Sequence, residues 1–526
     1  MRHLLLFAAT GVLLVLVHSS RPVIAAIPNP VKVDGGLVSG MAGADAGVTV
    51  FKGIPYAAPP IKDLRWRAPQ PVVAWQGVRA ADRYAPRCPQ NDGGWFPPNN
   101  GTRPAIEISE DCLSLNIFTA ARSAADARPV IVFVHGGGLS SGAGSYYDGE
   151  ALAKKGAVVV TLNYRLGVFG FLAHPDLTKE SGHKSSGNYG LLDQIEALRW
   201  VQSNIAAFGG DPKRVTLAGQ SAGAWSVNFL MASPLARGLF PRVIGGSGGQ
   251  FAPARRKAAA EDAGLQFLKA AGASSVAALR AMPAADLQKT GRLPGVPGRL
   301  WDVNVDGWIL PDDVAAIFEQ GKQNDVPILI GSNAGEWTSP RVTAVTAATL
   351  REEAQQLFGS DAATFPKLYP FENDESARLA QQYLHRDQTF GWPTREWARA
   401  QVKTGRSKVY FYFFQHVSPG PYADAGMAAP HGGELPFVFD WVNSKTNTGT
   451  EWRDGERKLA DAMSTYWLNF AATGDPNGKD LVRWPAYDSA TNTVLLIDDG
   501  ITTGPLPHKD ELDFLSPFMR KPMASR

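Results

Sequence analysis

Ser221 lies between two glycines at a spacing that suits a nucleophile. Gly219, Ser221 and Gly223 form a G-x-S-x-G pattern between an apolar, strand-like run that starts at Val215 and a helix-like run. A tight turn from strand to helix needs small residues on both sides of the serine, because larger side chains would collide with the strand or the helix. The pattern therefore predicts a nucleophile elbow with Ser221 at its tip, although so short a pattern also occurs in ordinary turns.

A histidine must accompany Ser221, because a serine hydroxyl attacks a carbonyl only when a base accepts its proton and an acid holds that base. In chains with this elbow, the order along the sequence is serine, acid, histidine. His431 stands before Gly432 and Gly433 in a loop between apolar segments, from which it can reach across a cleft. We predict that His431 is the base, with His416 at the end of an aromatic strand as the alternative.

The acid should follow a strand between the serine and the histidine. Glu336 lies six positions beyond Ile330, at the carboxyl end of a predicted strand and directly after Gly335. Asp302 and Asp306 are the alternatives, since a carboxylate at any of these places can also be a surface group or a turn-forming residue. Glu336 is the predicted acid.

A run of glycines follows another apolar strand. His135 is followed by Gly136, Gly137 and Gly138, and consecutive glycines leave backbone N–H groups free to point into a cleft. A phosphate-binding loop is the competing interpretation, but no lysine or Ser/Thr follows at the required spacing. The run therefore predicts an oxyanion hole.

The elements that must position these residues alternate between strands and helices. Residues 31–40 and 48–60 predict an antiparallel N-terminal meander. Strands are predicted within residues 113–120, 128–137, 157–167, 214–220, 242–248, 326–333 and 408–416, and those within 128–137, 157–167 and 214–220 are buried, apolar runs. Residues 188–207 place apolar side chains at helical spacing, and residues 255–271 form an alanine-rich helical stretch. This alternation predicts an α/β fold with a mostly parallel, twisted sheet and helices on both faces, whose ligands bind at the carboxyl ends of the strands.

The composition limits the class of protein further. The chain has 526 residues, of which 44% are hydrophobic and 19% charged, so it can bury a large core. It has no obvious linker or repeat, and we predict one domain over residues 27–526. The net charge is only +3 and no dense basic run is present, which argues against a nucleic-acid partner.

The first 26 residues have the pattern of a signal peptide. Arg2 and His3 precede an apolar stretch from Leu4 to Val17, and small residues follow at Ala25 and Ala26. The stretch is shorter than the roughly 20 residues of a membrane helix, and no later segment is long enough, so no stable membrane anchor is expected. The prediction is an exported protein, periplasmic or secreted, with an uncleaved anchor as the alternative.

The two cysteines of the chain, Cys88 and Cys112, are separated by 24 positions. In an exported chain, an even number of nearby cysteines indicates a disulfide, whereas two reduced thiols are the alternative. The segment between them is polar and rich in proline and glycine, so a covalent bond there would stabilise it most.

Several motifs together resemble the type-B carboxylesterases, the cholinesterase-like branch of the α/β-hydrolases. The resemblance extends from about Val31 to about Tyr487 and rests on the motifs FKGIPYAAPP, LRWRAPQP, SEDCLSLNIF, VFVHGGG, NYRLGVFGFL, GNYGLLDQIEALRWVQSNIAAFGGDP, GQSAGAWS, GSNAGEW and HGGELPFVF. It implies a triad of Ser221, Glu336 and His431, oxyanion donors at Gly137, Gly138 and Ala222, and a disulfide between Cys88 and Cys112. It also implies hydrolysis of small-molecule esters through an acyl-enzyme, with no metal or organic cofactor.

The chain departs from this family pattern beside the nucleophile. Gln220 stands where many relatives carry glutamate, which weakens the case for a cationic substrate and favours neutral carboxylic esters. Folds of this kind also serve as binding or adhesion proteins that do not hydrolyse esters, so an inactive, cholinesterase-like binding protein is the alternative function. The natural ester and the oligomeric state do not follow from the sequence.

Overall fold

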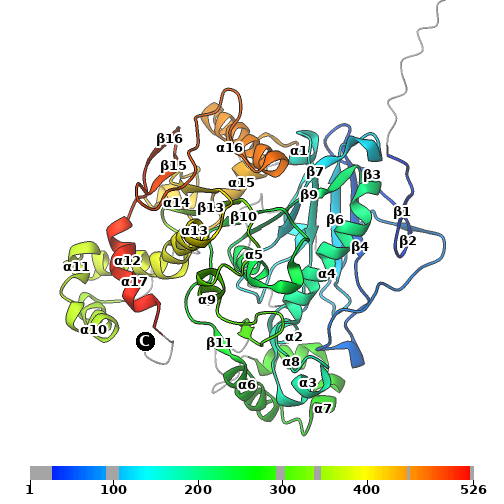
Figure 1. Ribbon diagram of the computed structural model, residues 1–526, viewed down its shortest axis with the longest axis horizontal. Coiled ribbons are helices and arrows are strands. Elements are labelled where there is room, and N and C mark those ends of the chain that lie inside the picture. Colours follow the sequence, from blue (N-terminus) through cyan, green and yellow to red (C-terminus); the bar gives the residue numbers. More distant parts are fainter. Residues whose placement is uncertain (1–26, 91–105, 292–301, 337–344, 447–450, 522–526) are drawn as a thin grey trace, which may run out of the picture.

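The computed structural model describes residues 27–90, 106–291, 302–336, 345–446 and 451–521. The predicted signal peptide, residues 1–26, therefore lies outside the described residues. In the described part of the chain, an 11-stranded sheet runs through the centre of the molecule, with helices on both sides (Figure 1).

The strand order of this sheet is β16-β15-β14-β13-β10-β9-β7-β8-β6-β4-β3. Neighbouring strands from β15 to β8 are parallel, while the strands at both edges are antiparallel, so the predicted mostly parallel sheet is confirmed. Its strands are β3 (Met41–Ala42), β4 (Thr49–Pro55), β6 (Ser114–Thr119), β7 (Arg128–Val134), β8 (Val158–Leu162), β9 (Gly210–Gln220), β10 (Arg242–Gly246), β13 (Ile328–Asn333), β14 (Val409–Phe414), β15 (Thr493–Ile497) and β16 (Ile501–Pro505).

The N-terminal meander is divided between two sheets. The hairpin of β1 (Val31–Val33) and β2 (Gly36–Ser39) pairs with β5 (Val78–Ala80), and only β3 and β4 join the large sheet. Trp75 explains this division, because its backbone N–H donates to Gly35 O and its indole N–H donates to Leu37 O, each at 2.9 Å. The segment before β5 is thus held against the hairpin.

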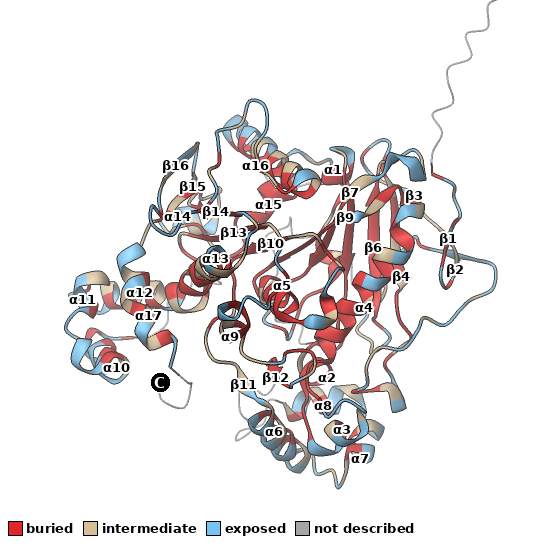
Figure 2. Ribbon diagram, in the orientation of Figure 1, coloured by how far each residue is buried: buried red, intermediate tan, exposed pale blue. Residues whose placement is uncertain are grey.

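The helices cover both faces because the residues of each central strand alternate between two cores. Val130, Val132 and Val134 of β7 belong to one core with residues of α4 (Tyr189–Asn204) and α5 (Ala222–Ala232). Ile131 and Phe133 belong to the other core with residues of α16 (Asp454–Thr473). Successive side chains of a strand point to opposite faces, so an all-apolar strand is buried on both. Figure 2 shows the buried sheet between helices whose outer surfaces are exposed.

The remaining helices extend from the sheet toward the periphery. They are α1 (Glu150–Lys154), α2 (Gly167–Phe171), α3 (Pro175–Glu180), α6 (Lys257–Ala270), α7 (Val276–Ala281), α8 (Ala284–Thr290), α9 (Val314–Glu319), α10 (Ala347–Phe358), α11 (Phe365–Leu368), α12 (Asp374–Arg386), α13 (Trp392–Thr404), α14 (Pro421–Asp424), α15 (Leu435–Val438) and α17 (Lys509–Met519). The helix expected from Arg255 begins two residues later, because Arg255 and Arg256 form β11, which pairs with β12 (Asn304–Val305).

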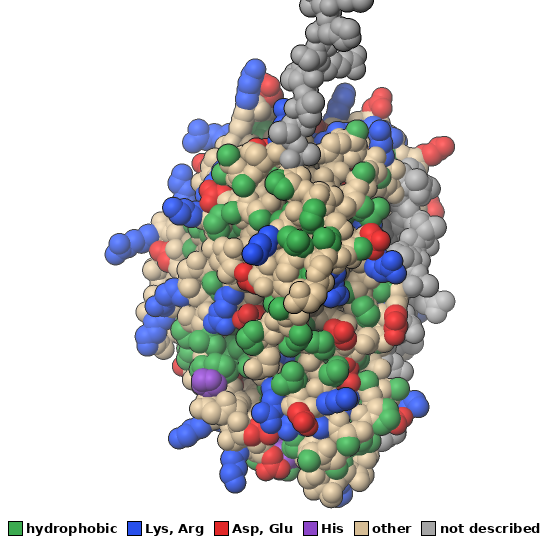
Figure 3. All heavy atoms as spheres, turned by 90° about the vertical axis from the view of Figure 1, so that its right-hand side faces the viewer, with side chains coloured by type: hydrophobic (Ala, Val, Ile, Leu, Met, Phe, Trp, Pro, Cys, Tyr) green, Lys and Arg blue, Asp and Glu red, His purple; other side chains and the backbone are tan. Residues whose placement is uncertain are grey.

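Charged side chains of both signs are mixed on the surface formed by the N-terminal strands, where Figure 3 shows Lys and Arg beside Asp and Glu. Across the described ranges, every helix is too short or too polar to cross a bilayer.

Candidate active site

The turn that carries Ser221 joins β9 directly to α5. Ser221 has φ 59° and ψ −129°, a backbone conformation that residues other than glycine rarely adopt. A Cβ atom on Gly219 would overlap the backbone of Gly223, and a Cβ atom on Gly223 would overlap Val134 O. Both glycines are therefore required for the close approach of strand and helix, as the pattern predicted. Strained residues of this kind often occur at functional sites.

Glu336 and His431 are 95 positions apart in sequence and form a buried hydrogen bond. His431 Nδ1 lies 2.5 Å from Glu336 Oε2, and the two side chains are 3% and 0% exposed. Glu336 follows the carboxyl end of β13, and its other carboxylate oxygen accepts from the N–H of Asn333 at 2.7 Å. An ionised carboxylate only accepts hydrogen bonds, so Nδ1 carries the proton in this pair.

The other ring nitrogen of His431 faces the nucleophile elbow. His431 Nε2 lies 3.3 Å from Nε2 of Gln220, the residue directly before Ser221. With the proton on Nδ1, the Nε2 atom of a neutral ring carries a lone pair and accepts hydrogen bonds, as a general base requires. The structure thus brings the predicted base and acid together at the turn that carries the predicted nucleophile.

The alternative residues occupy other environments. His416 is 2% exposed, and its ring nitrogens lie 2.8 Å from Asp499 Oδ1 and 3.3 Å from Glu456 Oε1. Asp306 Oδ1 accepts from the N–H groups of three following residues, Trp308, Ile309 and Leu310, which is the pattern of a turn-forming aspartate. Asp302 lines a cavity described below.

The glycine run after β7 forms a turn whose geometry depends on glycine. Gly137 and Gly138 have φ values of 107° and 62°, and Gly137 O accepts from the N–H groups of Ser140 and Ser141. A Cβ atom on Gly137 would overlap Ser141 O. The strand before this turn and the elbow are adjacent, because β7 pairs with β9 up to Val134 and Gly219.

Three backbone N–H groups near Ser221 are candidates for binding an oxyanion. They belong to Gly137, Gly138 and Ala222, and none of them donates a hydrogen bond to another described residue. Ala222 is the first residue of α5, where N–H groups have no partner within the helix and the helix dipole favours negative charge. These groups can stabilise negative charge that develops above Ser221.

A neutral histidine supports the glycine turn. His135 is buried, its Nδ1 lies 2.8 Å from Gly136 O, and its ring stacks on Tyr164 with the centroids 4.4 Å apart. Burial lowers the pKa of His135 to about 4, so the ring is uncharged at neutral pH. His135 therefore donates from Nδ1 to the carbonyl of Gly136 and holds the turn without adding charge.

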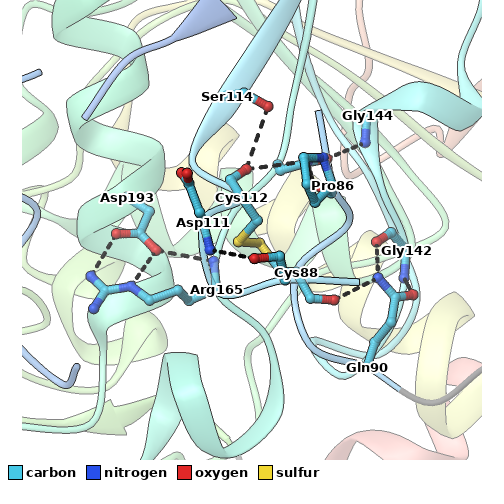
Figure 4. Close-up of a disulfide and its surroundings, with 12 residues drawn as sticks. Pro86, Cys88, Gln90, Asp111, Cys112, Ser114, Gly142, Gly144, Arg165 and Asp193 are labelled. Carbon is cyan, nitrogen blue, oxygen red and sulfur yellow. Dashed lines mark hydrogen bonds and ion pairs between the residues drawn. A yellow bond between two sulfur atoms is a disulfide. The ribbon is translucent and has the colours of Figure 1, made fainter. Parts of the chain in front are cut away.

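The disulfide restrains a segment that contacts the chain just after the same turn. Cys88 and Cys112 form the predicted bond, both residues are 1% exposed, and their Cα atoms are 5.1 Å apart. Figure 4 shows Gln90 beside this bond, where its side chain accepts from Gly142 N–H at 2.9 Å and donates to Gly142 O at 2.8 Å. The disulfide thus restrains a segment that contacts the residues just after the glycine run.

A cavity of about 350 Å³ opens beside the nucleophile helix. Its lining includes Trp225 and Thr389. The backbone N–H of Trp225 donates to Ser221 O at 3.0 Å, and Thr389 directly precedes Phe390. Phe390 lies on the π-helix η7 (Asp387–Gly391), and its ring centroid is 4.4 Å from that of His431. Insertions of this kind are frequent at functional sites, and the sequence contains no simple signal for the π-helical conformation of this segment.

Asn333 and Glu434 are further residues that the sequence analysis did not single out. Asn333 Nδ2 donates to Glu434 Oε2 at 2.6 Å and to Pro430 O at 2.8 Å, which connects β13 to the segment before His431. Both residues lie within quoted motifs, GSNAGEW and HGGELPFVF, and a polar residue at the end of a buried strand is a signal that could have pointed to Asn333.

Among the described residues, His416, Asp498 and Asp499 place possible metal ligands within 4.8 Å of one another. Both ring nitrogens of His416 already lie against carboxylates, and the two aspartates are exposed. This group therefore offers no free imidazole nitrogen to a metal ion.

Known proteins share the sequence pattern and the fold of this chain. A model of the carboxylesterase family matches residues 28–515. Fumonisin B1 esterase of Sphingopyxis macrogoltabida is 37% identical over 483 residues, which cover 89% of this chain and 86% of that protein. Para-nitrobenzyl esterase of Bacillus subtilis is 35% identical, covering 90% and 95% of the two chains. The solved structures of a PNB esterase and a thermophilic PNB esterase match with TM-scores of 0.78 and 0.80, each at 33% identity over 93% of this chain and 99% of theirs.

The mostly parallel sheet, the elbow and these structural matches define an α/β-hydrolase. The chain belongs to the carboxylesterase family and is a carboxylic ester hydrolase. The alternative of a binding protein without hydrolytic activity is accordingly not favoured.

Proposed function

We propose that the protein is an exported serine esterase that hydrolyses neutral carboxylic esters through Ser221, His431 and Glu336. The observation that carries this proposal is the buried 2.5 Å hydrogen bond between His431 and Glu336 beside the Ser221 turn. It supplies a base in the correct tautomer at the residue that the backbone geometry presents as a nucleophile.

In the first half of the reaction, Ser221 Oγ forms a bond to the ester carbonyl carbon while His431 Nε2 takes the hydroxyl proton. The N–H groups of Gly137, Gly138 and Ala222 bind the negative carbonyl oxygen, and one such donor contributes about 3 kcal/mol to transition-state stabilisation. The carbon–oxygen bond to the alcohol then breaks, and His431 gives its proton to the departing alkoxide. Glu336 stabilises the imidazolium throughout.

In the second half, water replaces the alcohol. His431 Nε2 takes a proton from the water, whose oxygen bonds to the acyl carbon, and the bond to Ser221 Oγ breaks as the serine regains its proton. Acid and free enzyme result. Each proton that leaves a nucleophile thus reaches a leaving group through one ring nitrogen.

The charge of the substrate follows from the surroundings of the nucleophile. Gln220 is 1% exposed, carries no charge and contacts His431, so this position contributes nothing that attracts a cation. The neighbouring cavity includes the aromatic side chains of Trp225, Phe229, Phe251 and Phe358, which suit an apolar acyl or alcohol group. Relatives named for fumonisin B1, cocaine and para-nitrobenzyl esters support a small-molecule ester as the substrate, and their names differ in the ester.

Export is supported by the N-terminal pattern and by the buried disulfide, since disulfides persist in oxidising compartments. The expected mature chain begins near Ala26 or Ile27, and mass spectrometry of exported protein would measure this start.

The S221A substitution tests the proposed nucleophile. We expect S221A to abolish hydrolysis of p-nitrophenyl acetate and labelling by a fluorophosphonate while the protein remains folded, because the hydroxyl supplies chemistry rather than packing. S226A is the matched control, since Ser226 is a buried serine of α5, the helix that follows Ser221, and its Oγ accepts from Gln194 Nε2. A folded S221A protein with turnover close to that of the wild type would refute the proposal.

A further inference from the structure

A second glutamate is buried beside the predicted triad. Glu434 lies three residues after His431 and is 2% exposed, and its side-chain Oε2 accepts a hydrogen bond from Asn333 Nδ2. Its other oxygen, Oε1, is enclosed and has no partner among the described residues. A buried carboxyl group with an unsatisfied oxygen is unfavourable, so its presence next to a reaction centre requires an explanation.

The position of Glu434 relative to the predicted triad is set by two contacts. Asn333 donates from its backbone to Glu336 Oε1 and from its side chain to Glu434 Oε2, so one residue joins the two carboxyl groups. On the other side, a Cβ atom on Gly246 would lie 3.0 Å from Glu434 Oε1 and 3.5 Å from Gln220 Cγ. Because Gly246 has no side chain, Glu434 and Gln220 approach the same point next to the elbow.

The charge of Glu434 depends on pH in the neutral range. Burial and the negative charge of Glu336 raise the pKa of Glu434 to about 7, although Asn333 and His431 act in the opposite direction. The other titratable groups that face it are the phenols of Tyr412 on β14 and Tyr147 before α1. Burial raises the pKa of both phenols, so they remain neutral while Glu434 titrates.

We propose that Glu434 is a positioning residue that acts through His431, and that its ionised form adds a second negative charge that stabilises the imidazolium in the transition state. This inference rests on the proposed function, because it requires His431 to be the base. At the transition state His431 is positive and the substrate oxygen negative. Glu434 is joined to the positive partner through Asn333 and Glu336, so its charge favours the transition state over the neutral resting ring.

The pH profile of kcat/KM tests this role. We compare wild type and E434Q with p-nitrophenyl acetate from pH 5.5 to 8.5, since glutamine keeps an oxygen for Asn333 but never ionises. Below pH 6 both proteins carry a neutral group, and their kcat/KM values should agree within about twofold. Above pH 8 the kcat/KM of the wild type should be about fivefold to tenfold higher than that of E434Q, as expected for one additional charge near the imidazolium in a partly polar interior.

A purely structural role would change the rate without changing its dependence on pH. A ratio of wild type to E434Q that is constant from pH 5.5 to 8.5, or that falls with pH, would overturn the proposal. E434A removes the contact with Asn333 as well as the charge, so it should be slower than E434Q at every pH. Activity of E434A equal to that of E434Q would contradict the positioning by Asn333.

An independent measurement does not require activity. Infrared difference spectra between pH 6 and 8.5 should contain a carbonyl band of a protonated carboxylic acid that is lost with rising pH in wild type and absent from E434Q. Spectra that show no such difference would refute the proposal even if E434Q folded poorly. Failure of S221A to lose activity would instead contradict the proposed function, so the two failures are distinguishable.

Discussion

Replacement of Glu336 by glutamine should inactivate the base by changing its tautomer. The backbone N–H of Asn333 donates to Glu336 Oε1 at 2.7 Å, so the amide oxygen of a glutamine must occupy this place, since an NH2 group would face another donor. The NH2 group would then point at His431 Nδ1, which lies 2.5 Å from Oε2 in the wild type. Nδ1 would have to accept, and the ring proton would move to Nε2, where a base needs a lone pair.

The loss follows from this geometry. A neutral amide neither selects the active tautomer nor stabilises an imidazolium, and changes of this kind in serine hydrolases lower the rate about 10³- to 10⁴-fold, which is roughly 4 to 5.5 kcal/mol. Because glutamine has almost the same volume as glutamate, the thermal unfolding midpoint should change little.

The assay measures kcat/KM for p-nitrophenyl acetate together with thermal unfolding. D306N is the matched control, because Asp306 is the other buried carboxylate considered for this role and instead accepts from backbone N–H groups of its own turn. It should retain kcat/KM within about threefold. A folded E336Q protein that is less than tenfold slower than wild type would show that this carboxylate does not orient the base.

Three further predictions concern the base, the disulfide and the substrate. H431Q should lose at least about 10³-fold in kcat/KM, whereas H416Q should keep most activity because His416 contacts Glu456 and Asp499 away from the elbow; the reverse result would move the base to His416. The C88S/C112S variant should lose about 3 kcal/mol of unfolding free energy, because the disulfide closes a loop between two cysteines that are 24 positions apart. An unchanged denaturation midpoint would contradict this prediction. At low salt and pH 6, 3,3-dimethylbutyl butyrate should be hydrolysed with a kcat/KM at least equal to that of butyrylcholine; a preference of tenfold or more for the cation would refute the argument from Gln220.

Local constraints made much of this protein predictable from its sequence. The elbow was recognisable because Gly219 and Gly223 must lack side chains where β9, α5 and β7 meet, a requirement that acts on neighbouring residues. Strands β7, β8 and β14 were recognisable because they are largely buried on both faces and are therefore mostly apolar. The glycine run was also recognisable, because the backbone conformations of Gly137 and Gly138 exclude larger residues.

Pairing across long distances was decided only by the tertiary structure. By residue type and position alone, Asp302, Asp306 and Glu336 were each possible acids, and only the folded chain places Glu336 within 2.5 Å of His431. The hairpin of β1 and β2 was expected to form one meander with β4, but it pairs with β5 in a separate sheet, where the indole of Trp75 donates to Leu37 O. Likewise, the ionisation of Glu434 depends on burial and on the charge of Glu336, a residue 98 positions earlier. Such contacts join segments whose separation carries no local pattern, because hydrogen bonds and electric fields act through space rather than along the chain.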